Sequence, residues 1–217
     1  MTSANLVGII SQWREFKDRK VYIGPDEVYL AADLAQKDIC SALNVLEGFK
    51  TLNLLASTER YVMTADVLSV FFIRKLSPNV GEIKVRSLSE IELNRSQFAA
   101  TVVGTQVVYA YQIFTNPITL GFQGVPAAAM DVELSYYRVP LPAEYPSNSV
   151  NPVIPATYDK LLILGTLYHA LDLRPEKEID ALKDAYKARY EKERDDTRKK
   201  IGASRFRAQH EPDEMVF

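Results

Sequence analysis

The residues best able to do acid–base chemistry in this 217-residue chain are two histidines and the carboxylates near them. His169 and Asp172 lie three residues apart in a stretch with helical periodicity, so the carboxylate could orient the imidazole as a general base. That spacing arises often by chance in helices, and the chain is poor in groups that could converge on the pair. His210 lies in a polar tail without rigid surroundings. We therefore expect no catalytic residue.

Motifs for nucleotide, metal or covalent chemistry are absent from the sequence. It has no nucleophile elbow, phosphate-binding glycine loop, dinucleotide fingerprint, zinc-protease helix or EF-hand loop. The carboxylates of Asp195 and Asp196 lie among basic residues and are expected in solvent. A single cysteine, Cys40, excludes an internal disulfide and a cysteine zinc cage, and its apolar neighbours predict a small buried side chain. We expect no cofactor and no metal.

Composition and charge are those of an ordinary globular protein. Hydrophobic residues make up 47% and charged residues 25%, which argues against wholesale disorder. The formal charge of −2 gives the molecule as a whole no attraction for nucleic acid, so such binding would need a local patch. The N-terminal residues do not resemble a secretory signal, and no run of about 18 apolar residues is present. We expect no membrane partner.

Helical periodicity marks both ends of the chain. A first helix is predicted from apolar residues at spacings of three and four: Leu6, Ile9, Ile10, Trp13 and Phe16. A second helix begins at Gly24-Pro25 and is expected to run to about Glu47. A third helix follows Pro155, with apolar residues around nearly all of its circumference. Pro175 opens a fourth. We expect these segments, residues 1–48 and 153–200, to form one helical bundle.

Between these helices the period changes to that of β-strands. Residues 49–152 contain runs of β-branched and aromatic residues separated by Pro, Gly and Asn, which predict an inserted antiparallel sheet of five or six strands. Ser87 and Glu90 have capping-box spacing, so residues 87–98 predict a short helix. The proline-rich residues 140–152 predict an extended crossing back to the helices. The fold class is α+β.

The last predicted helix continues beyond the residues that could pack it against a hydrophobic core. Its apolar stripe ends at Tyr190, yet the helical pattern continues to Lys200, a length of roughly 40 Å from Pro175. Charges of both signs alternate there, and the expected pairs are Asp195 with Lys199 and Asp196 with Lys200. Residues 201–217 form an extended tail with isolated apolar residues, which a lone monomer would leave disordered. A partner is therefore expected to cover this end.

Three segments, together with the order of the elements, carry a resemblance to a known family: RYVMTADVLSVFFIRK, NPVIPATYDKLLILGTLYHAL and AYKARYEKERDDTRKK. In these features the chain resembles the head-to-tail connector (adaptor) proteins of tailed bacteriophages. Pro152, Pro155 and Tyr158 fit a family pattern that precedes a helix. Where the family commonly has a tyrosine-x-hydrophobe-proline-x-aspartate element, the segment from Tyr61 to Asp66 lacks the proline.

This resemblance implies a structural role in the neck of the virion, after assembly in the host bacterial cytoplasm. Twelve copies would form a ring beneath the portal vertex, bind the portal protein and a tail or nozzle protein, and line the conduit that double-stranded DNA passes through. We expect the portal interface to comprise Arg194, Arg198, Lys199, Lys200, Arg205, Phe206, Arg207, Met215 and Phe217. Two alternatives remain open: a DNA-binding accessory protein, and a small-molecule enzyme with a pocket around His169.

Overall fold

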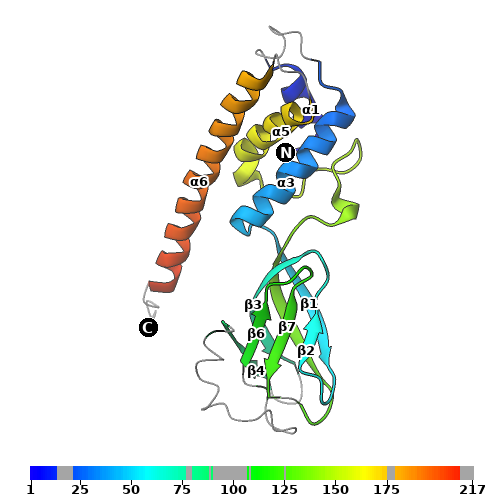
Figure 1. The fold of residues 1–217 in the computed structure, drawn as a ribbon, viewed down its shortest axis with the longest axis vertical. Coiled ribbons are helices and arrows are strands. Elements are labelled where there is room, and N and C mark those ends of the chain that lie inside the picture. The colour runs from blue at the N-terminus through cyan, green and yellow to red at the C-terminus, as the bar shows by residue number, and fades with distance from the viewer. Residues whose placement is uncertain are drawn as a thin grey trace, which may run out of the picture. The chain divides into compact units, whose positions relative to one another are not determined.

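The computed structural model describes residues 1–13, 22–76, 80–87, 89, 107, 109–124, 126–174 and 179–210, with the backbone alone for 204–210. The chain forms two compact units (Figure 1). Met1–Val45 and Pro140–Phe217 make a helical unit, and Leu46–Val139 make a β unit. The predicted α+β class is confirmed. In the described part of the chain, no helix combines the length and the apolar character that a membrane span requires.

The described part of the helical unit contains four α-helices: α1 (Ser3–Ser11), α3 (Pro25–Leu43), α5 (Asp159–Asp172) and α6 (Asp180–His210). Each contributes to one core, in which Leu6 of α1, Val28 of α3, Leu167 of α5 and Tyr186 of α6 are fully buried. Cys40 is buried on α3, as predicted. Pro175, which the sequence places at the start of the last helix, lies outside the described residues, as does Phe16.

The second helix begins where the sequence predicts but ends earlier. Gly24 is the N-cap residue, and its backbone N–H donates to Glu27 Oε2 at 3.0 Å. The helix stops at Leu43, four residues before the expected end, because Asn44 adopts the left-handed conformation (φ 53°) that closes many helices. Glu47, expected in the helix, is instead the first residue of a strand.

Residues 140–152 pack with the helices, whereas the sequence analysis groups them with the β module. The Ser3 hydroxyl donates to the Val150 carbonyl at 2.6 Å, and the Ser3 amide donates to Asn151 Oδ1 at 3.0 Å. The Val153 amide donates to Gln36 Oε1 at 2.7 Å. One 3₁₀ turn, η1 (Pro142–Glu144), lies within this segment, and a second, η2 (Ala156–Tyr158), follows it. The boundary between the units therefore falls at Val139, not at residue 152.

The β unit is a sandwich of two four-stranded sheets. The first sheet has the order β1-β8-β3-β4 and the second has the order β2-β7-β6-β5. The first comprises β1 (Glu47–Leu54), β8 (Met130–Arg138), β3 (Val67–Lys75) and β4 (Gly81–Glu82). The second comprises β2 (Arg60–Val62), β7 (Thr119–Gln123), β6 (Tyr109–Ile113) and β5 (Lys84–Arg86).

The expectation of one antiparallel sheet with five or six strands is wrong. Some strands pair with partners distant in sequence: β1 pairs with β8, and β2 pairs with β7. One pair, β5 with β6, is parallel. Strands of two or three residues, such as β4 and β5, carry too little alternation to be seen in a sequence. The short helix expected at residues 87–98 falls almost entirely outside the described residues.

The two sheets bury a common core between their inner faces. Val70 and Leu134 come from the first sheet, and Leu120 and Phe122 come from the second. A side chain also joins the sheets: the Gln112 amide of β6 accepts from the Val70 N–H and donates to the Val70 carbonyl, both at 2.7 Å. Both backbone groups of Val70 thereby have a hydrogen-bond partner from the other sheet.

Tyr111 lies across Gly121, its neighbour on β7, and this contact leaves no space for a side chain. A Cβ at residue 121 would lie 2.2 Å from Tyr111 Cζ. The Tyr111 hydroxyl donates to Glu59 Oε1 at 2.5 Å, which fixes the ring in this position. Burial and this hydrogen bond raise the pKa of Tyr111.

We expect Gly121→Ala to lower the free energy of unfolding by about 1–3 kcal/mol, since the Tyr111 ring must move and its hydroxyl leaves Glu59. The measurement is urea unfolding of the variant in two backgrounds, wild type and Tyr111→Ala. The loss should disappear when Tyr111 is alanine. An equal loss in both backgrounds would contradict the role given to the ring.

Candidate functional site

Helix α6 is held to the bundle by two buried tyrosines four residues apart. Tyr186 and Tyr190 are 0% and 1% exposed. Trp13 Nε1 donates to the Tyr186 hydroxyl, and the Tyr190 hydroxyl donates to Asp38 Oδ2 at 2.6 Å. A buried hydroxyl without a partner destabilises a protein, so these two bonds select one position of the helix. Burial and the Asp38 carboxylate raise the pKa of Tyr190, which keeps it a neutral donor.

Two arginines extend this attachment along α3. Arg194 Nη1 lies 3.3 Å from Asp38 Oδ2, and its Cζ lies 5.6 Å from the centre of the Tyr190 ring. One turn later, Arg198 Nη2 donates to the Ala42 carbonyl at 3.4 Å. Ala42 is in the last turn of α3, where carbonyls lack helical partners and the helix dipole favours a cation. Arg194 and Arg198 therefore contact the chain's own bundle.

Along α6 the charges pair within the helix. Asp195 lies 3.9 Å from Arg198 and Asp196 lies 3.9 Å from Lys199, at spacings of three residues where the sequence analysis expects four. Both spacings place side chains on neighbouring positions of a helix. The side chains are exposed, with 80% of Lys199 accessible, so each pair adds little stability. Lys160 of α5 adds a contact with Glu193 at 2.5 Å.

The C-terminal end of α6 extends past the ends of α3 and α5 within the helical unit (Figure 1). The helix has 31 residues, a length of about 46 Å. The sequence predicts that an extended tail begins at residue 201. This is wrong for residues 201–210, which continue the helix to His210. Alanine, arginine and glutamine favour a helix there, and no proline occurs before Pro212.

The expected portal interface is described only in part. Arg194, Arg198, Lys199 and Lys200 lie on α6 with their side chains described, whereas Arg205, Phe206 and Arg207 are placed by the helix backbone alone. Met215 and Phe217 lie outside the described residues. The sequence analysis missed Asp38 and Ala42, which meet α6 from another helix. No spacing rule within one helix could have found them.

The pair proposed for general base chemistry does not assemble. Asp172 Oδ1 lies 2.5 Å from Lys183 Nζ. The His169 ring instead lies 4.8 Å from Tyr168 and 6.4 Å from Tyr190, between ring centres, and its buried Nε2 has no hydrogen-bond partner in the described structure. Burial lowers the pKa of His169, partly offset by Asp38 and Asp172. The described residues contain no group of side chains that could hold a metal ion.

Comparison with known proteins gives one family. The family model described as SU10 adaptor protein matches residues 22–213, which is most of the chain. No curated protein matches it. The chain belongs to the SU10 adaptor protein family, and the resemblance to phage adaptors drawn from the sequence is confirmed.

We expect Asp38→Asn to lower the free energy of unfolding by about 1–3 kcal/mol, because Tyr190 and Arg194 both lose the charge they share. Asp195→Asn is the matched control, since it removes an exposed partner of Arg198 and should change stability by less than about 0.5 kcal/mol. Urea unfolding of both variants is the measurement. Equal effects would mean that Asp38 does not fasten α6.

Acid is expected to destabilise the chain through His169. Burial holds the pKa of folded His169 below the ordinary histidine value of about 6.5, so the unfolded chain binds this proton first as the pH falls. Stability contributed by the neutral imidazole is present above pH 6.5 and declines below it. The free energy of unfolding should therefore fall less steeply between pH 7 and pH 5.5 in His169→Gln than in the wild type. Identical slopes would contradict this assignment.

Proposed function

We propose that this member of the SU10 adaptor protein family is a structural subunit that joins the head of a phage to its tail, as a ring beneath the portal vertex. The chain is a phage adaptor, and the family implies interaction with other virion components. The observation that carries the finer proposal is helix α6, which is fixed at one end by buried tyrosines and continues beyond the bundle.

A helix with these properties suits a protein partner. Its first part is fixed in direction by Tyr186, Tyr190 and Arg194, so little freedom is lost when its far end binds. Its far end, residues 197–210, carries five cations and no carboxylate, which favours a partner with an acidic surface. The portal protein is the partner we propose for it.

The contacts proposed for the portal divide into two groups. Arg194 and Arg198 hold α6 to α3 and so set the direction of the helix. The portal would meet the residues that follow, with apolar anchors and cations close together in the sequence. These are Lys199, Lys200, Arg205, Phe206, Arg207, Met215 and Phe217.

The ring, its twelve copies, the tail or nozzle protein beneath it and transient contact with passing DNA belong to the same proposal. A ring requires two unlike surfaces on each subunit, and the chain offers a helical unit and a β unit of different composition. The location would be the neck of the virion. The role requires no catalytic residue, no cofactor and no membrane.

The test mixes the purified chain with the portal protein of the same phage and follows assembly by mass photometry and electron microscopy. The wild type should form rings only in the mixture. A chain ending at Lys200 should lose at least about tenfold in portal affinity, equivalent to about 1.4 kcal/mol. Lys187→Ala, an exposed change in the first half of α6, is the control and should assemble normally.

Full portal binding by the shortened chain would reject the role of the α6 end. A wild-type chain that ignores the portal would reject the adaptor proposal itself. If that chain instead bound double-stranded DNA with a strong dependence on salt, the DNA-binding alternative would take its place.

A further inference from the structure

The outer face of the first sheet carries exposed aromatic side chains. Residues paired across antiparallel strands point to the same side, and Ser135 pairs with both Phe49 and Phe72. Phe49 is 68% exposed and Phe72 is 37% exposed. At the irregularity between Val70 and Phe72, Phe71 also turns outward, 41% exposed, and its ring lies 4.5 Å from that of Tyr137. We call this surface the aromatic face.

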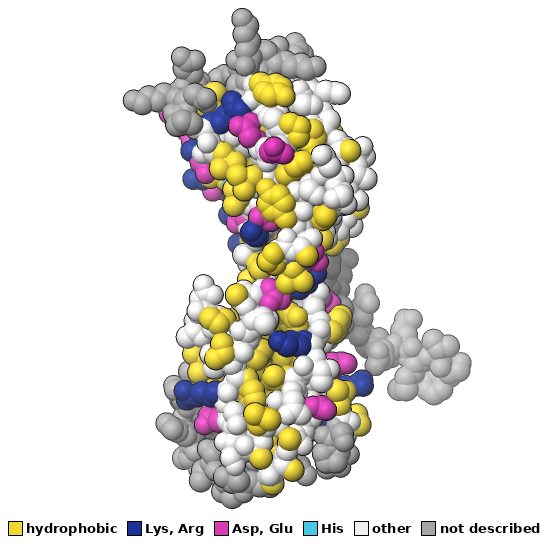
Figure 2. All heavy atoms as spheres, turned by 90° about the vertical axis from the view of Figure 1, so that its right-hand side faces the viewer, with side chains coloured by type: hydrophobic (Ala, Val, Ile, Leu, Met, Phe, Trp, Pro, Cys, Tyr) yellow, Lys and Arg dark blue, Asp and Glu magenta, His cyan; other side chains and the backbone are white. Residues whose placement is uncertain are grey.

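The charges on the aromatic face are mainly negative. The register places five charged residues on this side of the sheet, four carboxylates and one guanidinium among the described residues: Glu47, Glu82, Asp131, Glu133 and Arg74. Glu47 and Glu82 lie at its two edges, on β1 and β4. Figure 2 views the side of the β unit on which β1 and β2 lie, where hydrophobic side chains occur together with charged ones of both signs. An apolar surface with an acidic border is typical of an interface.

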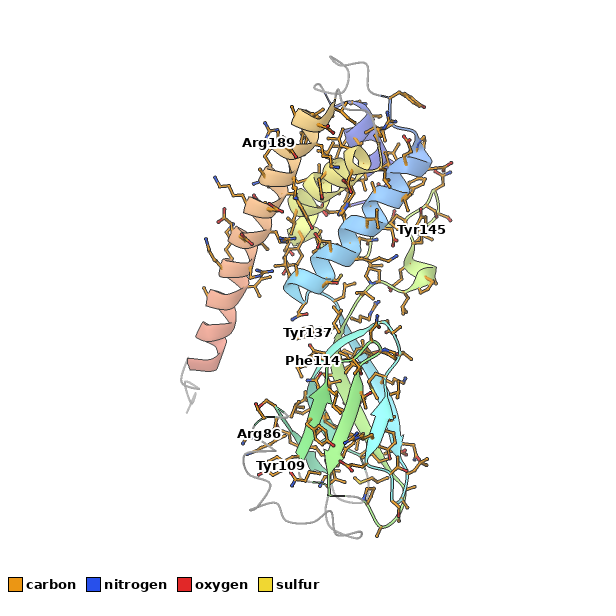
Figure 3. The ribbon with its side chains drawn as sticks, in the orientation of Figure 1. Arg86, Tyr109, Phe114, Tyr137, Tyr145 and Arg189 are labelled. Carbon is orange, nitrogen blue, oxygen red and sulfur yellow. The ribbon has the colours of Figure 1, made fainter. Side chains whose placement is uncertain are left out.

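The outer face of the second sheet has the opposite charge. The strand register aligns four residues across this sheet, one from each strand, and so places them on the same side: Arg60, Gly121, Tyr111 and Arg86. In the next row, Lys84 pairs with Tyr109. The Arg86 guanidinium lies 5.8 Å from the centre of the Tyr109 ring, and Figure 3 shows the two side chains on the same margin of the β unit. We call this surface the basic face.

The basic face also carries a carboxylate. Glu59, beside Arg60 in sequence, accepts the hydrogen bond of the Tyr111 hydroxyl. The face thus combines three cations, Arg60, Lys84 and Arg86, with the Tyr109 ring, whereas Tyr111 is only 5% exposed. Tyrosine and arginine are enriched at protein interfaces because they supply contact area and hydrogen bonds together.

We propose that the aromatic face of one copy binds the basic face of the next copy, so that the β units form the contact between neighbours in the assembly. This inference rests on the proposed ring and identifies the surfaces that would close it. Two aromatic faces brought together would oppose carboxylates, and two basic faces would oppose cations, so like charges disfavour a twofold dimer. Pairing unlike faces is head-to-tail, the arrangement that generates rings.

Single-stranded or double-stranded nucleic acid is the other class of ligand that tyrosines and cations can bind. Three cations beside one carboxylate make a weak phosphate surface, and DNA on the basic face would leave the exposed aromatic face without a role. A second copy accounts for both faces with one contact. The experiment therefore measures assembly and DNA affinity on the same variants.

Charge reversal tests the pairing in the full chain. One variant reverses the basic face, with Arg60→Glu and Lys84→Glu, and a second reverses the aromatic face, with Glu47→Lys and Glu82→Lys. Each should lower the yield of rings on the portal protein by at least about tenfold. A third variant carrying all four changes restores opposite charges and should recover rings, which makes it the matched control. Circular dichroism and thermal melts establish that each variant folds.

The outcomes separate this inference from the proposed function. If the wild type and both two-residue variants form rings equally, the face-to-face contact is rejected while the adaptor role stands. If the four-residue variant fails to recover rings although it folds, the pairing of these two faces is likewise rejected. If the basic-face variant loses affinity for DNA and assembles normally, the basic face binds nucleic acid instead. Portal binding by single subunits, measured separately, reports on the proposed function alone.

Discussion

The position of the long final helix depends on the Asp38 carboxylate. This group on α3 accepts the hydroxyl of Tyr190 and lies beside the guanidinium of Arg194, so three side chains from two helices share one charge. Tyr190 is almost fully buried, and its hydroxyl requires a partner at that depth. With the helix fixed there, the residues that follow extend past the ends of α3 and α5. A charged helix of this length would be marginal in isolation.

The helices could be predicted from the sequence because their signals are local. Pro25 with Glu27 marks the start of α3, and the stripe of Ile179, Leu182, Tyr186 and Tyr190 marks the buried side of α6. The end of α3 could not be predicted, since it depends on one backbone conformation at Asn44. Strand positions were also visible, whereas their pairing was not: β1 and β8 are more than 70 residues apart, and nothing local encodes their register.

For the candidate surfaces, too, the sequence reveals features within one element but not contacts between distant elements. Interleaved charges on α6 were evident, but their partners Asp38 and Ala42 come from a helix more than 150 residues earlier. A net charge of −2 gave no indication that the two outer faces of the β unit differ in sign. The difference arises only once the register sorts each strand's alternate residues onto one side. Composition gives the net charge of the whole molecule but not the charge of each of its faces.

The two ends of the β unit are adjacent in the first sheet. Glu47 at the start of β1 pairs with Tyr137 near the end of β8, and the Arg138 amide donates to the Leu46 carbonyl at 3.0 Å. The segment thus leaves and returns to its host at neighbouring backbone positions. A domain with this property can be excised and replaced by a tight turn, or grafted into another helical scaffold, without stretching either chain. Gain, loss or exchange of this module requires no redesign of the helices that carry it.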